Sequence, residues 1–373
     1  MIYADNAATT KLDDDALKSM LPWLQSKYGN ASQSYSFGRE AKKALTEARS
    51  SIAKCIGAEL EEVYFTSGGS ESDNWALKGF MQSYCVGSII TSQIEHHAIL
   101  NTCKSLEKLG YTVDYLPVDY QGIVLPSTLE EGFTNKTKLV SIMLVNNEIG
   151  TIEPIKELAE ITHKYGALFH TDAVQAVGHI SIDVKKLGID MLSASAHKFN
   201  GPKGIGFLYV KKGIKLNSFI DGGAQESNMR AGTENVAAIV GMATALKKNN
   251  ELINETSTRL KMIEEGFIDT LRGSDIDFIR NGSENRAPGN VNISIRGANG
   301  EMLLHRLDLK GIAVSTGSAC DSVNTQVSHV IKAINVPKEY AEGTIRVSFG
   351  RNNEINDGKI IAKAIIDILR RQV

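Results

Sequence analysis

The sequence predicts an α/β protein with a large doubly wound, mixed-sheet domain and a smaller α+β domain towards the C-terminal end. Short apolar runs of strand length alternate with helical patterns along much of the chain, and beyond about residue 256 the elements become shorter. A length of 373 residues is enough for two domains that each bury a core. Because alternating strands and helices form a sheet covered by helices on both faces, this order indicates the fold class.

The first part of the chain carries the clearest alternation. A helix is predicted over residues 39–56, ended by Gly57, with an apolar stripe formed by Ala44, Leu45, Ala48, Ile52 and Ile56. A strand over 63–66, a glycine turn and a helical stretch through Met81 follow. Further strands are predicted at 88–91, 111–117, 138–145, 167–170, 191–195 and 205–210, with helical patterns between most of them. This order is typical of right-handed crossovers in a doubly wound sheet.

A domain boundary is predicted near residue 256. One helix is expected from Asn235 to Lys248, ending in the polar run 247–251, and a second long helix is expected through Leu271. After it come strands near 290–295 and 344–349 and a closing helix from Asp357 to Arg370. We therefore expect a large domain over 13–256 and a small domain formed by 1–12 and 257–373.

Composition and charge exclude several classes of partner. The formal net charge of −2 gives no reason to expect nucleic acid or an anionic membrane surface. No apolar run approaches the roughly 20 residues of a membrane span, and the first residues lack the pattern of a secretory signal. The four cysteines, Cys55, Cys85, Cys103 and Cys320, follow no metal-ligand or disulfide spacing. We expect no metal site and a reducing, cytoplasmic location.

Lys198 is the strongest candidate for chemistry. It follows a predicted strand, and Asp172 follows another one 26 residues upstream. A parallel sheet brings both side chains to the same carboxyl-end edge, where open α/β sheets bind ligands. A lysine amine opposite a carboxylate is what pyridoxal 5'-phosphate requires, for a Schiff base and for a protonated ring nitrogen respectively. The alternative is a surface ion pair worth under about 1 kcal/mol.

Two further segments follow predicted strands. The turn 67–70 combines glycines with a helix start, an arrangement that holds a phosphate through backbone N–H groups, and Ser70 adds a cap or a hydroxyl donor. An ordinary capped turn is the alternative for this segment. His96, just past the strand at 88–91, has a flat ring that could stack on a cofactor and shuttle protons, although a polar loop histidine fits equally.

Asn147 and Cys320 are weaker candidates on local grounds. The asparagine follows a strand and could hydrogen-bond a ring hydroxyl or a substrate carboxylate, or could only shape a turn. Cys320 lies among small residues, where its thiol could reach a substrate. Attack requires a thiolate, and the adjacent Asp321 disfavours that form. The local sequence alone therefore favours an unreactive loop cysteine, while Cys55 and Cys103 read as small core residues.

Together these segments resemble the pyridoxal-phosphate-dependent cysteine desulfurases of the NifS/IscS type, within the class V aminotransferase group. The resemblance runs nearly end to end, through residues 5–10, 28–30, 67–72, 146–150, 170–175, 195–204, 230–235, 317–320 and 346–350. It implies the fold-type I architecture of pyridoxal-phosphate-dependent transferases. It also implies conversion of L-cysteine to L-alanine, with sulfur passed on for iron–sulfur cluster or thio-cofactor synthesis.

The resemblance implies a role for each cofactor contact. Lys198 would bind the cofactor covalently, with Asp172 at the ring nitrogen and His96 stacked on the ring. Gln175 would contact the ring oxygen, and Asn147 would lie beside that oxygen and the substrate carboxylate. The phosphate would be held by Gly69, Ser70, Ser195 and His197.

The remaining implied roles concern substrate, sulfur and assembly. Arg346 would hold the substrate carboxylate, a bidentate task suited to guanidinium. Cys320 would attack the substrate sulfur and carry it as a persulfide. Thr233 would reach the partner's phosphate in a homodimer, and a sulfur-acceptor or scaffold protein of unknown identity is a further expected partner.

The sequence departs from the family pattern in three places, and alternatives remain open. Tyr35 stands where a histidine is usual, and the glycine-rich turn 222–229 and the stretch 324–329 after the loop cysteine also differ. A selenocysteine lyase or an aminotransferase would share the cofactor site, and a non-catalytic scaffold would be a folded dimer that retains the cofactor. Transamination needs no thiol, so Cys320 discriminates between a cysteine desulfurase and these other class V enzymes.

Overall fold

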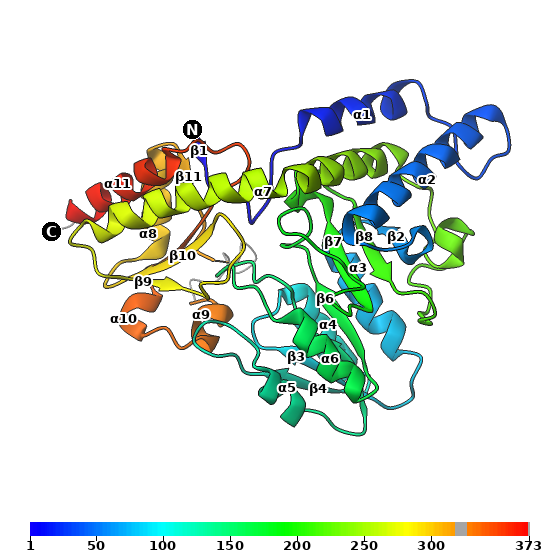
Figure 1. Ribbon diagram of the computed structural model, residues 1–373, viewed down its shortest axis with the longest axis horizontal. Coiled ribbons are helices and arrows are strands. Elements are labelled where there is room, and N and C mark those ends of the chain that lie inside the picture. The colour runs from blue at the N-terminus through cyan, green and yellow to red at the C-terminus, as the bar shows by residue number, and fades with distance from the viewer. Residues whose placement is uncertain (318–326, 372–373) are drawn as a thin grey trace.

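The computed structural model describes residues 1–317 and 327–371, and its largest element is a seven-stranded sheet (Figure 1). In spatial order the strands are β2 (Val63–Thr66), β8 (Gly206–Val210), β7 (Met191–Ser195), β6 (Leu168–Asp172), β5 (Thr137–Ser141), β3 (Ser88–Ser92) and β4 (Thr112–Leu116). Neighbours pair in parallel except β8, which is antiparallel to both β2 and β7. The predicted mixed α/β sheet is confirmed.

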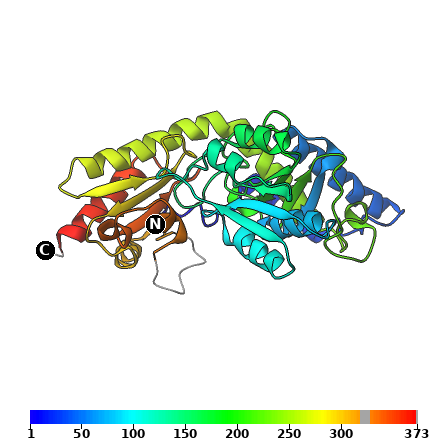
Figure 2. The ribbon, with the colours of Figure 1, turned by 90° about the horizontal axis from the view of Figure 1, so that it is seen from below.

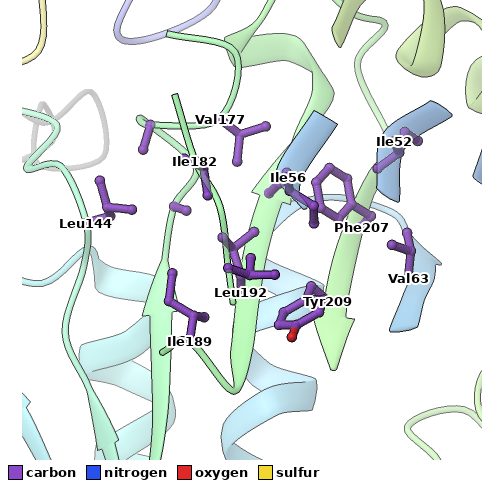
Figure 3. Close-up of a cluster of buried hydrophobic side chains, with 14 of the residues drawn as sticks. Ile52, Ile56, Val63, Leu144, Val177, Ile182, Ile189, Leu192, Phe207 and Tyr209 are labelled. Atoms are coloured by element: carbon purple, nitrogen blue, oxygen red, sulfur yellow. The ribbon is translucent and has the colours of Figure 1, made fainter. Parts of the chain in front are cut away.

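Helices cover both faces of this sheet. They are α1 (Asp14–Gln25), α2 (Ser36–Ile56), α3 (Gly69–Asn74), α4 (His97–Glu107), α5 (Pro126–Glu131) and α6 (Ile155–Lys164), with short helical turns η1 (Leu60–Glu62), η2 (Trp75–Gly79), η3 (Ala196–Lys198) and η4 (Gln225–Asn228). Alternate strand residues enter different hydrophobic clusters, because strand side chains point to opposite faces. Phe207 packs in the cluster that contains Ile52 and Ile56 of α2 (Figure 3), whereas Leu208 packs in the cluster that contains Trp75 of η2.

One strand is shorter than the sequence suggested. A strand was expected over 138–145, but β5 ends at Ser141. Residues 142–145 continue beyond the sheet ladder, where Leu144 N–H donates to the Asp172 backbone oxygen at 2.9 Å and Val145 forms an isolated bridge with Ile152. The apolar run therefore stays buried and hydrogen-bonded to the end of β6 beyond the last residue of β5, and its sequence pattern does not mark the end of the strand.

The second part of the structure is built on small sheets. Strands β12 (Thr344–Ser348), β10 (Asn290–Ile295) and β9 (Phe278–Asn281) pair antiparallel, and β1 (Ile2–Tyr3) pairs in parallel with β11 (Ile312–Ala313). The helices here are α8 (Gly300–Leu309), α9 (His329–Ala333), α10 (Lys338–Ala341) and α11 (Asp357–Arg370). The N-terminal strand thus joins a sheet formed by residues more than 300 positions away.

A single long helix links the two parts. The prediction of two separate helices over 235–271 is therefore wrong. Helix α7 runs without a break over Val236–Arg272, along one side of both parts (Figure 2). The polar run at 247–251 does not end the helix, because its side chains find tertiary partners. Asn249 donates to the Phe199 backbone oxygen at 2.6 Å, and Asn250 donates to that of Cys55 at 2.9 Å.

Buried residues of α7 belong to two different cores. The first half contributes Ile239, Met242 and Leu246 to the core of the large sheet, and the second half contributes Ile263 and Phe267 to the core of the small part. Residue 256 lies inside this helix, so the predicted domain limits at 12/13 and 256/257 remain a prediction. Within the described residues, no helix combines the length and apolar character needed to cross a membrane.

Candidate active site

A cavity of about 500 Å³ opens where the carboxyl ends of the large sheet meet the N-terminal segment. The segments after β2, β3, β5, β6 and β7 all contribute to its wall. It brings together most of the predicted site residues, namely Gly69, Ser70, His96, Asn147, Asp172, Gln175, Ser195, His197, Lys198 and Arg346. The expectation that parallel strands deliver these side chains to one edge agrees with this geometry.

Lys198 ends the turn η3 directly after β7. Its ammonium nitrogen donates to the backbone oxygens of Ala7 at 2.7 Å and of Ala8 at 2.8 Å. A buried ammonium is costly unless it is hydrogen-bonded, so these two carbonyls help to hold the amine inside the cavity. The N-terminal segment is itself attached to the lysine turn, since Thr10 N–H donates to the His197 backbone oxygen at 2.9 Å.

Asp172 is the last residue of β6 and is almost fully buried. One carboxyl oxygen accepts from the Val174 N–H at 2.9 Å. Burial raises the pKa of Asp172, while the charges of His96 and Lys198 and the Val174 hydrogen bond oppose that rise. A cationic partner at this carboxyl would lower its pKa further. Gln175, one turn later, donates to the Ala7 oxygen at 2.9 Å.

The glycine turn after β2 forms a close-fitting wall of the cavity. Gly68 has φ +154°, and a Cβ on Gly69 would lie 2.6 Å from Val174 Cγ2, so neither position accommodates a larger residue without rearrangement. Ser195 faces the same turn. Burial, with the charges of Lys198 and Lys203, lowers the pKa of His197 to about 4, which keeps its ring neutral at pH 7.

His96 is positioned by the helix that it starts. It is the N-cap of α4, and its Nδ1 accepts from the Ala98 N–H at 3.1 Å. This hydrogen bond leaves Nε2 as the ring nitrogen that carries a proton in the neutral form. The ring therefore stands at the cavity wall in a fixed tautomer.

Arg346 enters the cavity from the small part, on β12, and its side chain is 2% exposed. Its two terminal nitrogens donate to the Asn147 backbone oxygen at 2.9 Å and to Asp5 Oδ1 at 2.8 Å. Its Nε is buried and has no hydrogen-bond partner within the described residues. A buried guanidinium N–H without an acceptor is costly, so this atom is suited to an anionic ligand.

Thr233 is not brought into this cavity, and one predicted residue cannot be placed. Thr233 lines a separate cavity of about 200 Å³ that shares Ser67 and Gly204 with the first one. Cys320 lies outside the described residues. Tyr35, one of the departures from the family pattern, is 53% exposed, precedes α2 and is not among the residues that line the main cavity.

Comparison with known proteins identifies the family. The model of the aminotransferase class-V family matches residues 2–360. The chain belongs to the aminotransferase class-V family. It is 48% identical over 375 residues to the cysteine desulfurase IscS of Dictyoglomus turgidum, with 99% of this chain and 95% of the relative covered. It is 45% identical over 372 residues to the cysteine desulfurase IscS of Methanosarcina thermophila, with 99% and 92% covered.

Solved structures of this family share the fold. A NifS-like protein superposes with a TM-score of 0.93 at 37% identity, covering 99% of both chains. A structure described as SspA in complex with cysteine has a TM-score of 0.84 at 34% identity and covers 94% of this chain and 99% of the other. The likeness confirms the predicted fold class for the class-V chain.

Three buried titratable groups next to the cavity were not identified as functional residues from the sequence. They are Asp73, Glu95 and His170. Burial raises the pKa of Glu95 to about 8 and lowers that of His170 to about 3, and burial together with Asp172 raises the pKa of Asp73 well above its ordinary value. Glu95 and His170 are therefore mostly neutral at pH 7, and the neutral form of Asp73 is favoured relative to an exposed carboxyl. Their only signal in the sequence was a polar residue beside an apolar run.

The pH dependence of stability should report on Glu95. Its pKa rises from the ordinary 4.5 to about 8 on folding, so the folded state binds the proton more tightly and its stability falls as pH rises between these values. Glu95→Gln keeps an oxygen that can accept from Ser92 Oγ and Met143 N–H, and removes the ionisation. We expect the apoprotein variant to match wild type near pH 5 and to exceed it at pH 8, by at most about 1.4 kcal/mol per pH unit.

Urea unfolding between pH 5 and 8 provides this measurement. Glu157→Gln, at an exposed position of α6, is the matched control and should leave the pH profile unchanged. Parallel profiles for wild type and Glu95→Gln would mean that Glu95 does not carry the proton.

Proposed function

We propose that this chain is a pyridoxal-phosphate-dependent cysteine desulfurase, which converts L-cysteine to L-alanine and transfers the sulfur to Cys320. The observation that carries the proposal is the convergence of Lys198, Asp172 and Arg346 on one cavity. These residues supply an amine for an aldehyde, a carboxyl for a ring nitrogen and a guanidinium for a substrate carboxylate. The names of relatives that are 45% and 48% identical over nearly the whole chain support the same chemistry.

The residues of the cavity fit pyridoxal phosphate. The turn at Gly68 and Gly69 has no Cβ to obstruct an anion, and a helix start there directs backbone N–H groups towards it. Ser195 and the neutral His197 add groups that can hydrogen-bond a phosphate. When bound, this cofactor withdraws electrons from the α-carbon of the substrate into its ring. Asp172, ionised beside a protonated ring nitrogen, would maintain that capacity.

Lys198 and Arg346 then act on the substrate. Lys198 Nζ would act as the base that takes the proton from the α-carbon of the substrate. Arg346 orients the substrate through its carboxylate, and its guanidinium plane is fixed by the Asp5 carboxylate and the Asn147 backbone oxygen. The buried Nε is one donor that remains for the ligand. Because the Arg346 side chain is only 2% exposed, an ion pair with a substrate carboxylate would be stronger there than in solvent.

Sulfur transfer is assigned to Cys320 on the strength of the family pattern over 317–320. The thiolate of Cys320 attacks the sulfur of the substrate, forming a sulfur–sulfur bond. The substrate bond between Cβ and Sγ breaks, and its electron pair stays with the carbon. Protonation of that carbon yields alanine, and the enzyme keeps a persulfide. We propose that an acceptor protein then takes this sulfur for iron–sulfur cluster or thio-cofactor synthesis.

Assembly as a symmetric homodimer is part of the proposal. Thr233 does not line the cofactor cavity of its own chain, which suits a role at the partner's site. The α1 region carries exposed apolar side chains suited to contact with a second copy, namely Leu17, Leu21, Leu24, Tyr28, Tyr35 and Phe37. We also propose a cytoplasmic location, because the described cysteines are free thiols.

The identity of the cofactor lysine can be tested directly. The purified protein should be yellow, and borohydride reduction followed by peptide mapping should place a pyridoxyl group on Lys198. Lys198→Ala should lose the covalent label, because no other amine is expected to form the linkage, while cofactor can still bind without a bond. Lys203, which also lines the cavity, is the internal control. A label on Lys203 would refute the assignment.

The role of Cys320 separates sulfur transfer from carbon chemistry. Cys320→Ser should keep cofactor binding, because Lys198 and Asp172 provide it. Alanine formation from cysteine should fall by at least about 100-fold, since a serine hydroxyl is a much poorer nucleophile than a thiolate at pH 7. Single-turnover mixing, with alanine measured per enzyme, gives the answer. Alanine release at the wild-type rate would instead favour a lyase or an aminotransferase.

The dimer is tested at the exposed face of α1. Light scattering and sedimentation should give a dimer for wild type, and Leu21→Lys with Leu24→Lys should shift it towards monomer because two charges would be buried at the contact. The secondary structure measured by circular dichroism should not change, since both side chains are exposed in the single chain. Leu309→Lys, at an 88% exposed position of α8, is the control. A fully active wild-type monomer would refute the dimer.

A further inference from the structure

The turn that precedes Thr233 has an unusual backbone. Glu226, Ser227 and Asn228 have φ values of +46°, +59° and +66°, three consecutive non-glycine residues in the left-handed region. Such residues raise the free energy of the folded state and persist only where the surroundings fix them. Some interaction must therefore stabilise this turn.

The carboxylate of Glu226 provides that interaction. Its side chain is 4% exposed and accepts from both terminal nitrogens of Arg49 at 2.6 Å, a bidentate pair, and from the Phe65 N–H at 2.8 Å. Arg49 also donates to the Val63 backbone oxygen at 2.5 Å and lies 4.2 Å over the Phe65 ring. Strand β2 is at the edge of the sheet, so this ion pair satisfies backbone groups of an edge strand.

A second ion pair connects the same turn to the glycine turn. Arg230 donates to both carboxyl oxygens of Glu71, at 2.9 Å and 3.2 Å. Glu71 in turn accepts from the Ser67 N–H at 2.8 Å. Residues 226 and 230, four positions apart, therefore fix the segment 65–71 at both ends.

We infer that the Arg49–Glu226 pair is a brace that holds the left-handed turn against the glycine turn, and that Glu226 is a positioning residue for the cofactor phosphate. This inference rests on the proposed function, because it assigns the glycine turn to a phosphate. Glu226 does not line the cofactor cavity, so it acts through Phe65 and the segment that follows. Its loss should weaken ligands that carry a phosphate more than ligands that lack one.

The test compares pyridoxal phosphate with pyridoxal, which lacks the phosphate. Each is titrated into apoprotein, and Kd is measured by absorbance. For Glu226→Gln we expect the Kd of pyridoxal phosphate to rise roughly tenfold and that of pyridoxal to change less than about twofold. Asp275→Asn, which removes the exposed Arg370–Asp275 pair, is the control and should change neither value.

A rescue variant tests the strain itself. Glycine adopts left-handed backbone without strain, so adding Ser227→Gly and Asn228→Gly to Glu226→Gln should restore most of the affinity for pyridoxal phosphate. Arg49→Lys keeps one charge but loses the bidentate contact, and we expect an intermediate Kd. This variant also serves if Glu226→Gln fails to fold.

The outcomes separate the two proposals. Three results would each contradict the proposed brace. Glu226→Gln could bind pyridoxal phosphate with wild-type affinity, or it could bind pyridoxal phosphate and pyridoxal more weakly by the same factor. The third is that adding the two glycines does not restore the affinity for pyridoxal phosphate. If wild-type protein binds neither ligand, the proposed function fails. The proposed brace is then tested by unfolding midpoints alone. It predicts that Glu226→Gln is less stable than both wild type and the glycine-containing variant.

Discussion

The N-terminal segment at residues 5–8 holds the candidate site together. Asp5 binds Arg346 of the small part, and Ala7 N–H donates to Ser348 Oγ at 3.0 Å on the same strand. From the other side, the Ala7 oxygen accepts from both Lys198 and Gln175 of the large sheet. One short stretch of chain thus contacts the amine of Lys198, the proposed ring contact Gln175 and the Arg346 guanidinium. These hydrogen bonds therefore help to fix the distance between the Lys198 side and the Arg346 side of the cavity.

The charges of the site are stable there because their surroundings are neutral. A fully buried ion is expensive, and several carboxylates in one low-dielectric region would repel one another. The raised pKa of Glu95 and the lowered pKa of His170 remove two potential charges at pH 7, and the raised pKa of Asp73 disfavours its ionised form. Ionised carboxylates next to Asp172 are thereby disfavoured. A cation bound at Asp172 would be the favourable counter-charge, as a protonated pyridine is.

Local sequence patterns predicted most strands of the large sheet and the convergence of Asp172 and Lys198, because short apolar runs mark strands and parallel strands end at one edge of a sheet. In that register Asp172 lies opposite Ser193, five residues before Lys198. The same reasoning failed for α7, since the partners of Asn249 lie elsewhere in the fold. It could not find the contact of Asp5 with Arg346, which are 341 positions apart. Interactions of that kind depend on tertiary arrangement and leave no local pattern.

Because Arg346 lies in the small part, the candidate site is formed by both parts of the chain. Its strand belongs to the small sheet, whereas the glycine turn, Asp172 and Lys198 belong to the large one. Helix α7, with 37 residues and a length of about 55 Å, packs into both cores and limits how far the parts can move apart. The N-terminal segment adds a second connection on the cavity side. A substrate carboxylate at Arg346 would therefore be placed relative to the cofactor by packing remote from either group.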